Sequence, residues 1–130
     1  MEINDEWLII SPERMGEAGY DGIDKLISKK SRPTAVFAAY DALAFGAINR
    51  LNEKGLRVPD DISIIGLNDI SLAKYATPAL TTVTIPINEL TDAALNLLYR
   101  RIKYTEAPYQ NVSIQSSLII RNSVKNVINQ

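Results

Sequence analysis

Residues 55–67 read GLRVPDDISIIGL, and this stretch decides the fold. Gly55 can adopt the left-handed conformation that ends a helix, and Pro59 prevents the helix from resuming. Residues 62–67 are apolar almost throughout, which is typical of a parallel strand covered on both faces. The stretch therefore predicts the end of one helix, a turn and a buried strand.

Strands and helices alternate on both sides of this stretch. In chain order the predicted elements are a strand over 7–10, a helix over 16–29, a strand over 35–39, a helix over 42–54 with Asp41 at its N-cap, the strand over 62–67, a loop over 68–80, a strand over 81–85, a long helix over 88–104 and one or two closing strands within 112–121. Such alternation predicts right-handed crossovers. The expected fold class is α/β, with a doubly wound, mainly parallel sheet and helices on both faces.

The composition is that of an ordinary globular domain. The chain has 130 residues, of which 46% are hydrophobic and 22% charged, and its formal net charge is -1. This length fits one domain. Because no sustained basic stripe is present, we expect no DNA binding by this chain alone.

Several absences narrow the chemistry. The sequence has no cysteine and no histidine, so it offers neither a thiol nucleophile nor the commonest general base and metal ligand. No glycine-rich turn follows a predicted strand, which disfavours dinucleotides. We therefore expect no enzyme activity, no cofactor and no metal. The acidic N-terminus lacks a signal-peptide pattern, and no apolar run could span a bilayer, so a cytoplasmic location is expected.

Polar side chains follow three of the predicted strands. In open parallel sheets, ligands bind at the carboxyl ends of the strands. We expect these side chains to form one rim that hydrogen-bonds a small polar ligand such as a polyol. They are Ser11, Glu13 and Arg14, then Tyr40 and Asp41, then Asn68 and Asp69.

Each of these residues also has a purely structural interpretation. Asp41 can cap its helix instead of contacting a ligand, or do both. Asn68 and Asp69 are ordinary turn formers, and Tyr40 can be a packing aromatic. Glu13 can be a solvated charge near a helix start. Pattern and spacing leave these alternatives open.

Three segments of the sequence resemble the LacI/GalR family of bacterial transcriptional repressors. They are PTAVFAAYD at 33–41, GLRVPDDISIIG at 55–66 and YATPALTTV at 75–83. The last of these is the most specific. The resemblance extends from near Gly19 to Ser123, so it covers most of the chain.

The resemblance implies a periplasmic-binding-protein type I-like core, in which two lobes enclose a sugar or another small effector. It also implies a homodimer and a separate headpiece that binds operator DNA. Residues 1–130 would be the C-terminal lobe of the effector-binding and dimerisation domain, and helix 88–104 would belong to the other lobe. We expect this chain to lack the headpiece and to involve no membrane. Effector binding would shift the lobes and change affinity for DNA.

Carried over residue by residue, the resemblance places ligand contacts at Arg14, Tyr40, Asp41, Asn68 and Asp69. Three of these positions depart from the family pattern. Many members have asparagine at Tyr40, aspartate at Asn68 and a stacking aromatic at Arg14. Arg14 adds a cation, and asparagine at position 68 removes an acidic acceptor. One hypothesis is therefore that the ligand is a phosphorylated or otherwise anionic sugar.

Helix 88–104 carries a row of large aliphatic side chains, and leaving several in water would cost about 5–10 kcal/mol. We expect this helix to pack against another copy of the chain, or to fold back on its own sheet. Two other classes remain as alternatives. The chain could be a fragment of an extracytoplasmic sugar-binding protein of the same fold, or a small α/β enzyme or receiver-like domain.

Overall fold

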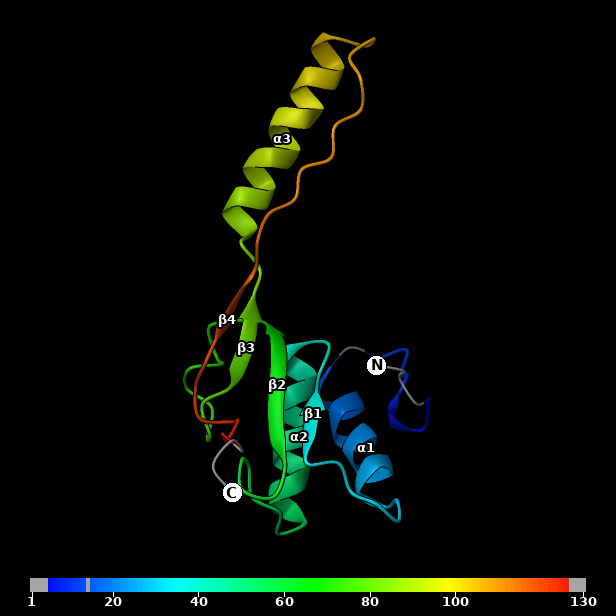
Figure 1. Ribbon diagram of the computed structural model, residues 1–130, viewed down its shortest axis with the longest axis vertical. Coiled ribbons are helices and arrows are strands. Elements are labelled where there is room, and N and C mark those ends of the chain that lie inside the picture. Colours follow the sequence, from blue (N-terminus) through cyan, green and yellow to red (C-terminus); the bar gives the residue numbers. More distant parts are fainter. Residues whose placement is uncertain (1–4, 14, 127–130) are drawn as a thin grey trace.

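The computed structural model describes residues 5–13 and 15–126, and it shows an α/β body from which a helical arm projects (Figure 1). In chain order the elements are the 3-10 helix η1 (Asp5–Trp7), α1 (Gly16–Ile27), β1 (Ala35–Phe37), α2 (Asp41–Glu53), β2 (Ser63–Asn68), β3 (Thr81–Thr84), α3 (Ile87–Lys103) and β4 (Ser117–Ile119). From α1 onward this order agrees with the predicted one.

The four strands form one mixed sheet in the order β1-β2-β3-β4. Strand β2 runs parallel to β1 and β3, and β4 is antiparallel to β3. In the register Val36 lies opposite Ile64, and Gly66 lies opposite Thr82. The prediction of an α/β fold with a mainly parallel sheet is confirmed.

The strand predicted over residues 7–10 is wrong. Trp7 closes η1, and residues 8–10 are not part of any strand. Ile9 packs against the core, whereas Leu8 and Ile10 are exposed. A strand needs a neighbour that supplies backbone hydrogen bonds, and no described strand pairs with this segment. Local β-propensity alone cannot replace that partner.

The turn that decides the fold forms as expected. Gly55 has a φ of 72°, in the left-handed region, directly after α2 and its C-cap residue Lys54. The amide of Leu56 then donates to the carbonyl of Leu51 at 2.9 Å. This is the hydrogen bonding of a helix C-cap, so the chain leaves α2 and enters β2.

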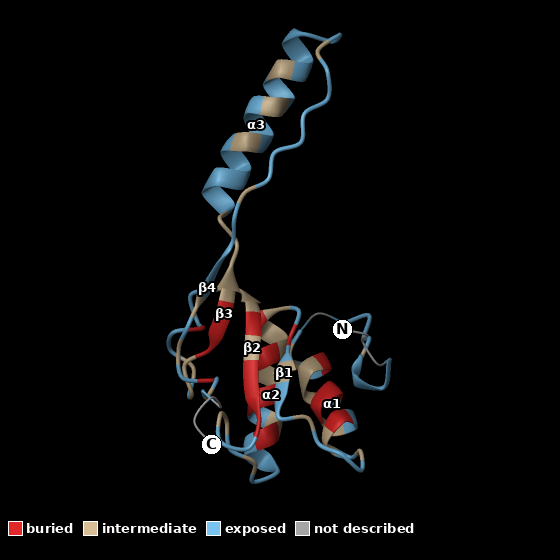
Figure 2. Ribbon diagram, viewed as in Figure 1, coloured by how far each residue is buried: buried red, intermediate tan, exposed pale blue. Residues whose placement is uncertain are grey.

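Helices α1 and α2 lie side by side in one layer, and α2 packs against β2. Their backbones approach so closely that a Cβ added at Gly19 would lie 2.0 Å from the carbonyl oxygen of Leu43. One added at Gly46 would lie 1.8 Å from the carbonyl oxygen of Gly16. The core sits between these helices and the sheet (Figure 2), and its fully buried large aliphatic residues are Ile23, Leu51, Ile62, Ile64 and Leu80.

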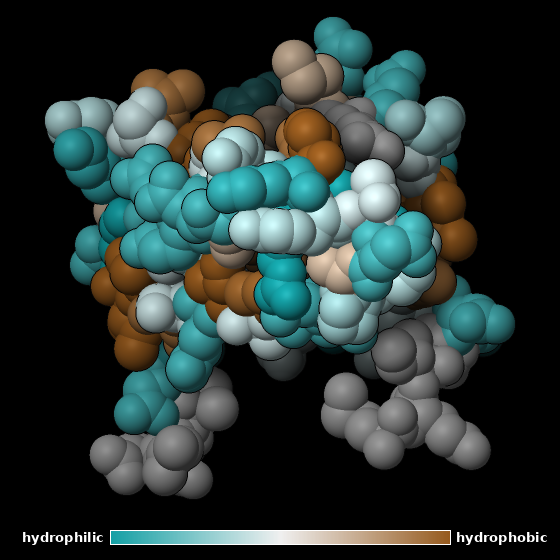
Figure 3. Space-filling view, turned by 90° about the horizontal axis from the view of Figure 1, so that it is seen from above, coloured by the Kyte–Doolittle hydropathy of each residue, from teal (hydrophilic) through white to brown (hydrophobic). Residues whose placement is uncertain are grey.

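The described helices cover only one face of the sheet, whereas we expected helices on both. On the other face, Phe37 is 60% exposed and Leu118 is 53% exposed. The β1–β2 crossover contributes α2, against which α1 packs, and the described connection from β2 to β3 contains no helix. Seen along the arm, hydrophobic side chains reach the surface at both flanks of the molecule (Figure 3).

A cluster of charged and aromatic side chains joins α1 to α2. The guanidinium of Arg50 binds Asp24 and Glu53 and stacks over the ring of Tyr20, 4.4 Å from its centroid. The hydroxyl of Tyr20 also donates to Glu53. The hydrogen bond from Arg50 lowers the pKa of Asp24, and those from Tyr20 and Arg50 lower the pKa of Glu53.

Helix α3 stands away from the body, and none of its residues is buried (Figure 2). The segment that follows α3 is held against the helix by contacts of Arg101. The guanidinium of Arg101 donates to the carbonyls of Thr105 and Ala107 and stacks over Tyr109, 4.8 Å from the ring centroid. The expectation that this helix folds back on its own sheet is therefore wrong. Packing against another copy stays a prediction.

We predict that Gly19→Ala lowers the free energy of unfolding by about 2–3 kcal/mol, because the new methyl overlaps the backbone at Leu43 and forces α1 and α2 apart. Urea denaturation measures this change. Gly22→Ala is the matched control in the same helix, since its Cβ would meet nothing closer than 3.5 Å. That variant should be unchanged, or up to about 1 kcal/mol more stable through helix propensity. Equal effects at both positions would contradict close helix packing.

We also predict that acid destabilises the fold partly through the α1–α2 cluster. Because the pKa values of Asp24 and Glu53 are lowered in the folded chain, their contribution is present above the unfolded pKa values. It is lost as pH falls below about 4. Denaturation across pH 2–6 should show a shallower acid loss for Asp24→Asn than for the unmodified chain. Asp21→Asn, at an exposed position of the same helix, is the control and should keep the full slope.

Candidate functional site

The predicted ligand residues that the structure describes follow β1 and β2 at one edge of the sheet. Tyr40 and Asp41 come three and four residues after the end of β1. Asn68 and Asp69 lie at the end of β2. Because β1 and β2 are parallel neighbours, both pairs lie at the carboxyl ends of the strands. Arg14 lies outside the described residues.

Asp41 does not cap α2, so that prediction is wrong. Tyr40 occupies the N-cap position without a side-chain cap, and Asp41 is the first residue of the helix. The Asp41 side chain is fully buried. Its Oδ2 accepts from the amide of Ile70 at 2.9 Å, and its Oδ1 accepts from the hydroxyl of Thr82 at 2.6 Å. Both carboxylate oxygens are thus used inside the chain.

The space for this carboxylate depends on Gly66 in the middle of β2. A Cβ at Gly66 would lie 2.2 Å from Oδ1 of Asp41, so a larger residue would displace the side chain. Glycine inside a strand often marks such a close approach. Gly66 is the sequence signal that could have distinguished a buried Asp41 side chain from one that caps the helix.

Asn68 and Asp69 form the turn that leaves β2, and both have positive φ angles of 118° and 52°. Non-glycine residues in such regions cost about 1–3 kcal/mol each and persist where their surroundings hold them. Here the amide of Asp69 lies 3.4 Å from the Thr82 hydroxyl, and the next amide, of Ile70, donates to Asp41. The turn-forming interpretation of this pair is correct, and the turn is strained.

The carboxylate of Asp69 pairs with an arginine that sequence reasoning did not select. Oδ1 of Asp69 lies 2.7 Å from Nη2 of Arg121, which follows β4. Nη1 of Arg121 donates to the carbonyl of Leu80 at 2.8 Å, and its amide donates to the hydroxyl of Thr81 at 2.9 Å. A charged residue at the end of the apolar run 118–120 was the available signal.

A second buried contact fastens the C-terminal segment to the sheet. The hydroxyl of Ser123 accepts from the amide of Thr81 at 2.8 Å and donates to the carbonyl of Ile64 at 2.6 Å. Ser123 is fully buried. The segment after β4 therefore bridges β2 and β3, and Arg121 is held by backbone as well as by side-chain bonds.

Tyr40 and Asn68 are partly exposed, unlike Asp41. Tyr40 lines a groove of about 740 Å³ between the segment 7–13, α1 and β1. Ser11 and Glu13 line the same groove, and the Ser11 hydroxyl accepts from the amide of Glu13 at 3.2 Å. The groove is otherwise lined mostly by apolar side chains. The groove thus offers phenol, hydroxyl and carboxylate groups, and Asn68 is not among its described lining residues.

The described part of the chain contains no group of three acidic side chains placed to hold a metal ion. Within the same ranges, no helix has the length and apolar character needed to cross a bilayer. What the rim provides is hydrogen-bond donors and acceptors beside an aromatic ring, which suits a small polyhydroxylated molecule.

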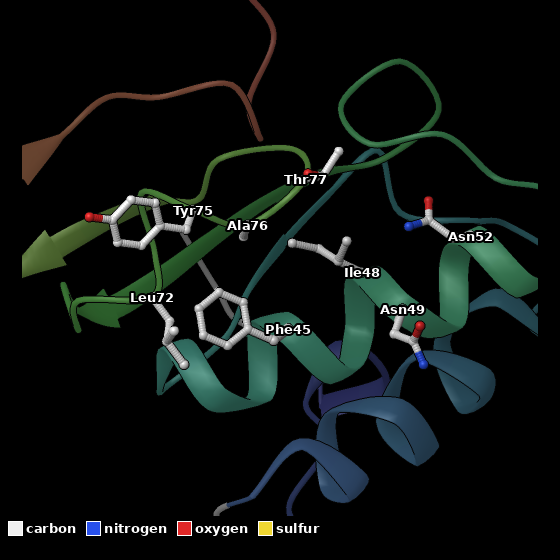
Figure 4. A pocket seen from close by; sticks show the side chains of 8 residues that line it. All are labelled: Phe45, Ile48, Asn49, Asn52, Leu72, Tyr75, Ala76 and Thr77. Carbon is white, nitrogen blue, oxygen red and sulfur yellow. The ribbon is translucent and has the colours of Figure 1, made fainter.

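A second concave surface lies between α2 and the loop 70–79 (Figure 4). We call it the α2 notch, and it has a volume of about 330 Å³. Phe45 projects from α2 toward Leu72 of the loop, and Leu72 and Tyr75 are largely exposed. All of the described side chains that line the notch are uncharged. Its residues are Phe45, Ile48, Asn49, Asn52, Leu72, Tyr75, Ala76 and Thr77.

Comparison with known proteins gives a consistent result. Residues 4–124 match the model of the periplasmic binding protein-like domain family. The chain is 39% identical over 127 residues to the HTH-type transcriptional repressor PurR of Mannheimia succiniciproducens, covering 98% of this chain and 38% of that protein. It is 38% identical over 122 residues to the ribose operon repressor of Haemophilus influenzae, covering 94% and 36% respectively. The chain thus spans well under half the length of these relatives.

A solved structure agrees with the sequence matches. The crystal structure of a LacI family transcriptional regulator from Enterococcus faecalis V583 with bound ribose superposes with a TM-score of 0.78. The two sequences are 31% identical, and the match covers 86% of this chain and 41% of that one. These relatives are repressors and not enzymes, which agrees with our expectation of a non-catalytic site. The resemblance to LacI-type regulators is confirmed, and the chain belongs to the periplasmic binding protein-like domain family.

Proposed function

We propose that this chain is one lobe of the effector-binding module of a LacI-type transcriptional regulator, and that it senses a sugar such as ribose. The observation that carries the proposal is the anchored, strained turn at Asn68, which lies at the same sheet edge as Tyr40. Backbone strain held in place by buried bonds is typical of ligand-binding positions. The relatives include a ribose operon repressor and a regulator with bound ribose.

Within this proposal the predicted ligand residues divide into two groups. Tyr40 and Asn68 contact the sugar, together with Arg14. The phenol and the amide can each donate and accept hydrogen bonds, and the ring of Tyr40 can stack on the apolar face of a sugar. Asp41 and Asp69 use their carboxylates inside the chain, so their part is to hold the turn and not to bind the ligand directly.

The arm supplies the link to the rest of such a regulator. We infer that α3 packs on the second lobe of the module through its apolar stripe, in which Leu98 and Ile102 are exposed. Sugar bound between the lobes would then change how they are oriented, and a DNA-binding headpiece elsewhere in the regulator would respond to that change. The repressor relatives favour this cytoplasmic role over an extracytoplasmic sugar-binding protein.

We further propose that the chain forms a homodimer through the α2 notch. Leu72 is 60% exposed and Tyr75 is 73% exposed, and both flank Phe45 beside a surface without charged lining. An apolar surface of this kind on a soluble domain marks a protein contact. A two-fold axis at the notch would bring each apolar patch onto its own copy.

Sugar binding gives the first test. D-ribose titrated to millimolar concentrations should shift the amide signals of Tyr40 and Asn68 in NMR spectra. Asn68→Ala removes an amide that both donates and accepts, and should weaken binding about tenfold, since one good hydrogen bond is worth about 0.5–1.5 kcal/mol. Asn49→Ala, in the α2 notch, is the control and should bind like the unmodified chain. Shifts confined to residues away from the β1–β2 edge would contradict the assigned site.

The dimer is tested by sedimentation velocity. Leu72→Glu places a charge in the α2 notch and should convert dimer to monomer, because a buried unpaired charge is strongly unfavourable. Leu98→Glu, on the exposed stripe of α3, is the matched variant and should leave the dimer intact. If Leu98→Glu dissociates the dimer and Leu72→Glu does not, the copies associate through α3 instead.

A further inference from the structure

We propose that the ion pair between Asp69 and Arg121 couples the ligand-facing turn to the segment that returns from the arm. This inference rests on the proposed sugar-sensing function and extends it to the route by which binding is transmitted. Asp69 and Arg121 are positioning residues: they act through Asn68 and through β4, and they do not contact the ligand.

The two partners belong to segments that the proposed function needs to connect. Asp69 follows Asn68 directly in the turn after β2. Arg121 comes two residues after the end of β4, and β4 is the strand into which the chain runs on its way back from the arm (Figure 1). The ion pair therefore joins the turn after β2 to the far end of the returning segment, past β4, with a separation of 2.7 Å between Oδ1 and Nη2. The near end of that segment, Ser117, pairs with Thr84, where the chain leaves the body for the arm.

The pair is shielded from water, and Arg121 cannot swing away without breaking other bonds. Its side chain is 18% exposed and that of Asp69 is 24% exposed. The second nitrogen of the guanidinium is bound to the carbonyl of Leu80. A shielded charge that loses its partner is destabilised far more than an exposed one, so either residue constrains the position of the other.

The turn at Asn68, on the ligand-facing side of the ion pair, is strained. A small change in its contacts is therefore enough to shift its backbone. Asn68 keeps its φ of 118° because the residues that follow it are held by Thr82, Asp41 and Arg121. A ligand that pulls on the Asn68 side chain changes the preferred position of the Asp69 carboxylate, and Arg121 follows. By linkage, a change in the returning segment must alter ligand affinity by the same factor.

The first experiment needs no ligand. Asp69→Asn should raise amide hydrogen exchange in residues 117–121 by about tenfold, because local opening of that segment loses one constraint. Arg121→Gln should reciprocally shift the amide signals of Asn68 and Asp69 in NMR spectra. The double variant should be no worse than either single variant. Asp61→Asn, which removes the exposed pair with Arg57, is the control and should change neither readout.

Core amides of α2 that keep their protection show that each variant is folded. A variant that fails this check is replaced. The replacement is either the charge-exchanged double variant, Asp69→Arg with Arg121→Asp, or the conservative variant Arg121→Lys. The proposal is overturned if folded Asp69→Asn leaves exchange in 117–121 unchanged and folded Arg121→Gln leaves the Asn68 signal unchanged.

The second experiment adds D-ribose. In the unmodified chain, saturating ribose should change exchange in 117–121, a segment that contains none of the proposed sugar-contacting residues. In Asp69→Asn, ribose should still shift the Asn68 signal while the change in 117–121 is lost. If the unmodified chain binds no ribose, the sugar assignment fails, and the ligand-free experiment still decides the coupling. If ribose acts on 117–121 equally in both proteins, the coupling through this pair is refuted.

Discussion

The buried carboxylate of Asp41 is the constraint on which the rest of the site depends. It lies at the first residue of α2, where the helix dipole favours a negative charge, and it is fully buried. Its two hydrogen bonds reach β3 through Thr82 and the loop through Ile70. A buried charge is tolerated only when its oxygens are satisfied, so α2, β3 and the loop must keep one relative position. Gly66 leaves the room that this arrangement requires.

This constraint fixes the backbone beside the side chains that we propose as ligand contacts. Asp41 accepts two hydrogen bonds and Asp69 forms an ion pair with Arg121, and these contacts hold the residues next to Asn68, whose φ is positive. Tyr40 directly precedes the buried carboxylate, so its backbone is fixed by the same anchor. A rim whose backbone is fixed before binding loses little further entropy when a ligand arrives. The buried polar bonds thus act as a support for the partly exposed phenol and amide.

The sequence predicted those features that local chemistry determines. Gly55 ends α2 because a left-handed residue is needed there, and the apolar run 62–67 forms the central strand. The segment 7–10 has a similar apolar pattern, but none of the described strands lies beside it, so it forms no strand. The burial of Asp41 and its contact with Thr82 join residues 41 positions apart. Such a contact depends on how β2 and β3 are placed, which local propensity and capping rules do not contain.

The buried polar groups around Asp41 are satisfied by internal hydrogen bonds, but several apolar surfaces of the chain are not covered. The network around Asp41 is closed within the body, whereas the stripe of α3 and the sheet face at Phe37 and Leu118 remain exposed. Apolar contact is non-directional, so these surfaces can accept a partner in more than one orientation. The hydrogen-bonded turn has one geometry. Under the proposed function, ligand binding at a fixed rim would therefore select among orientations of a less constrained arm, and Arg121 holds the body end of the segment that returns from it.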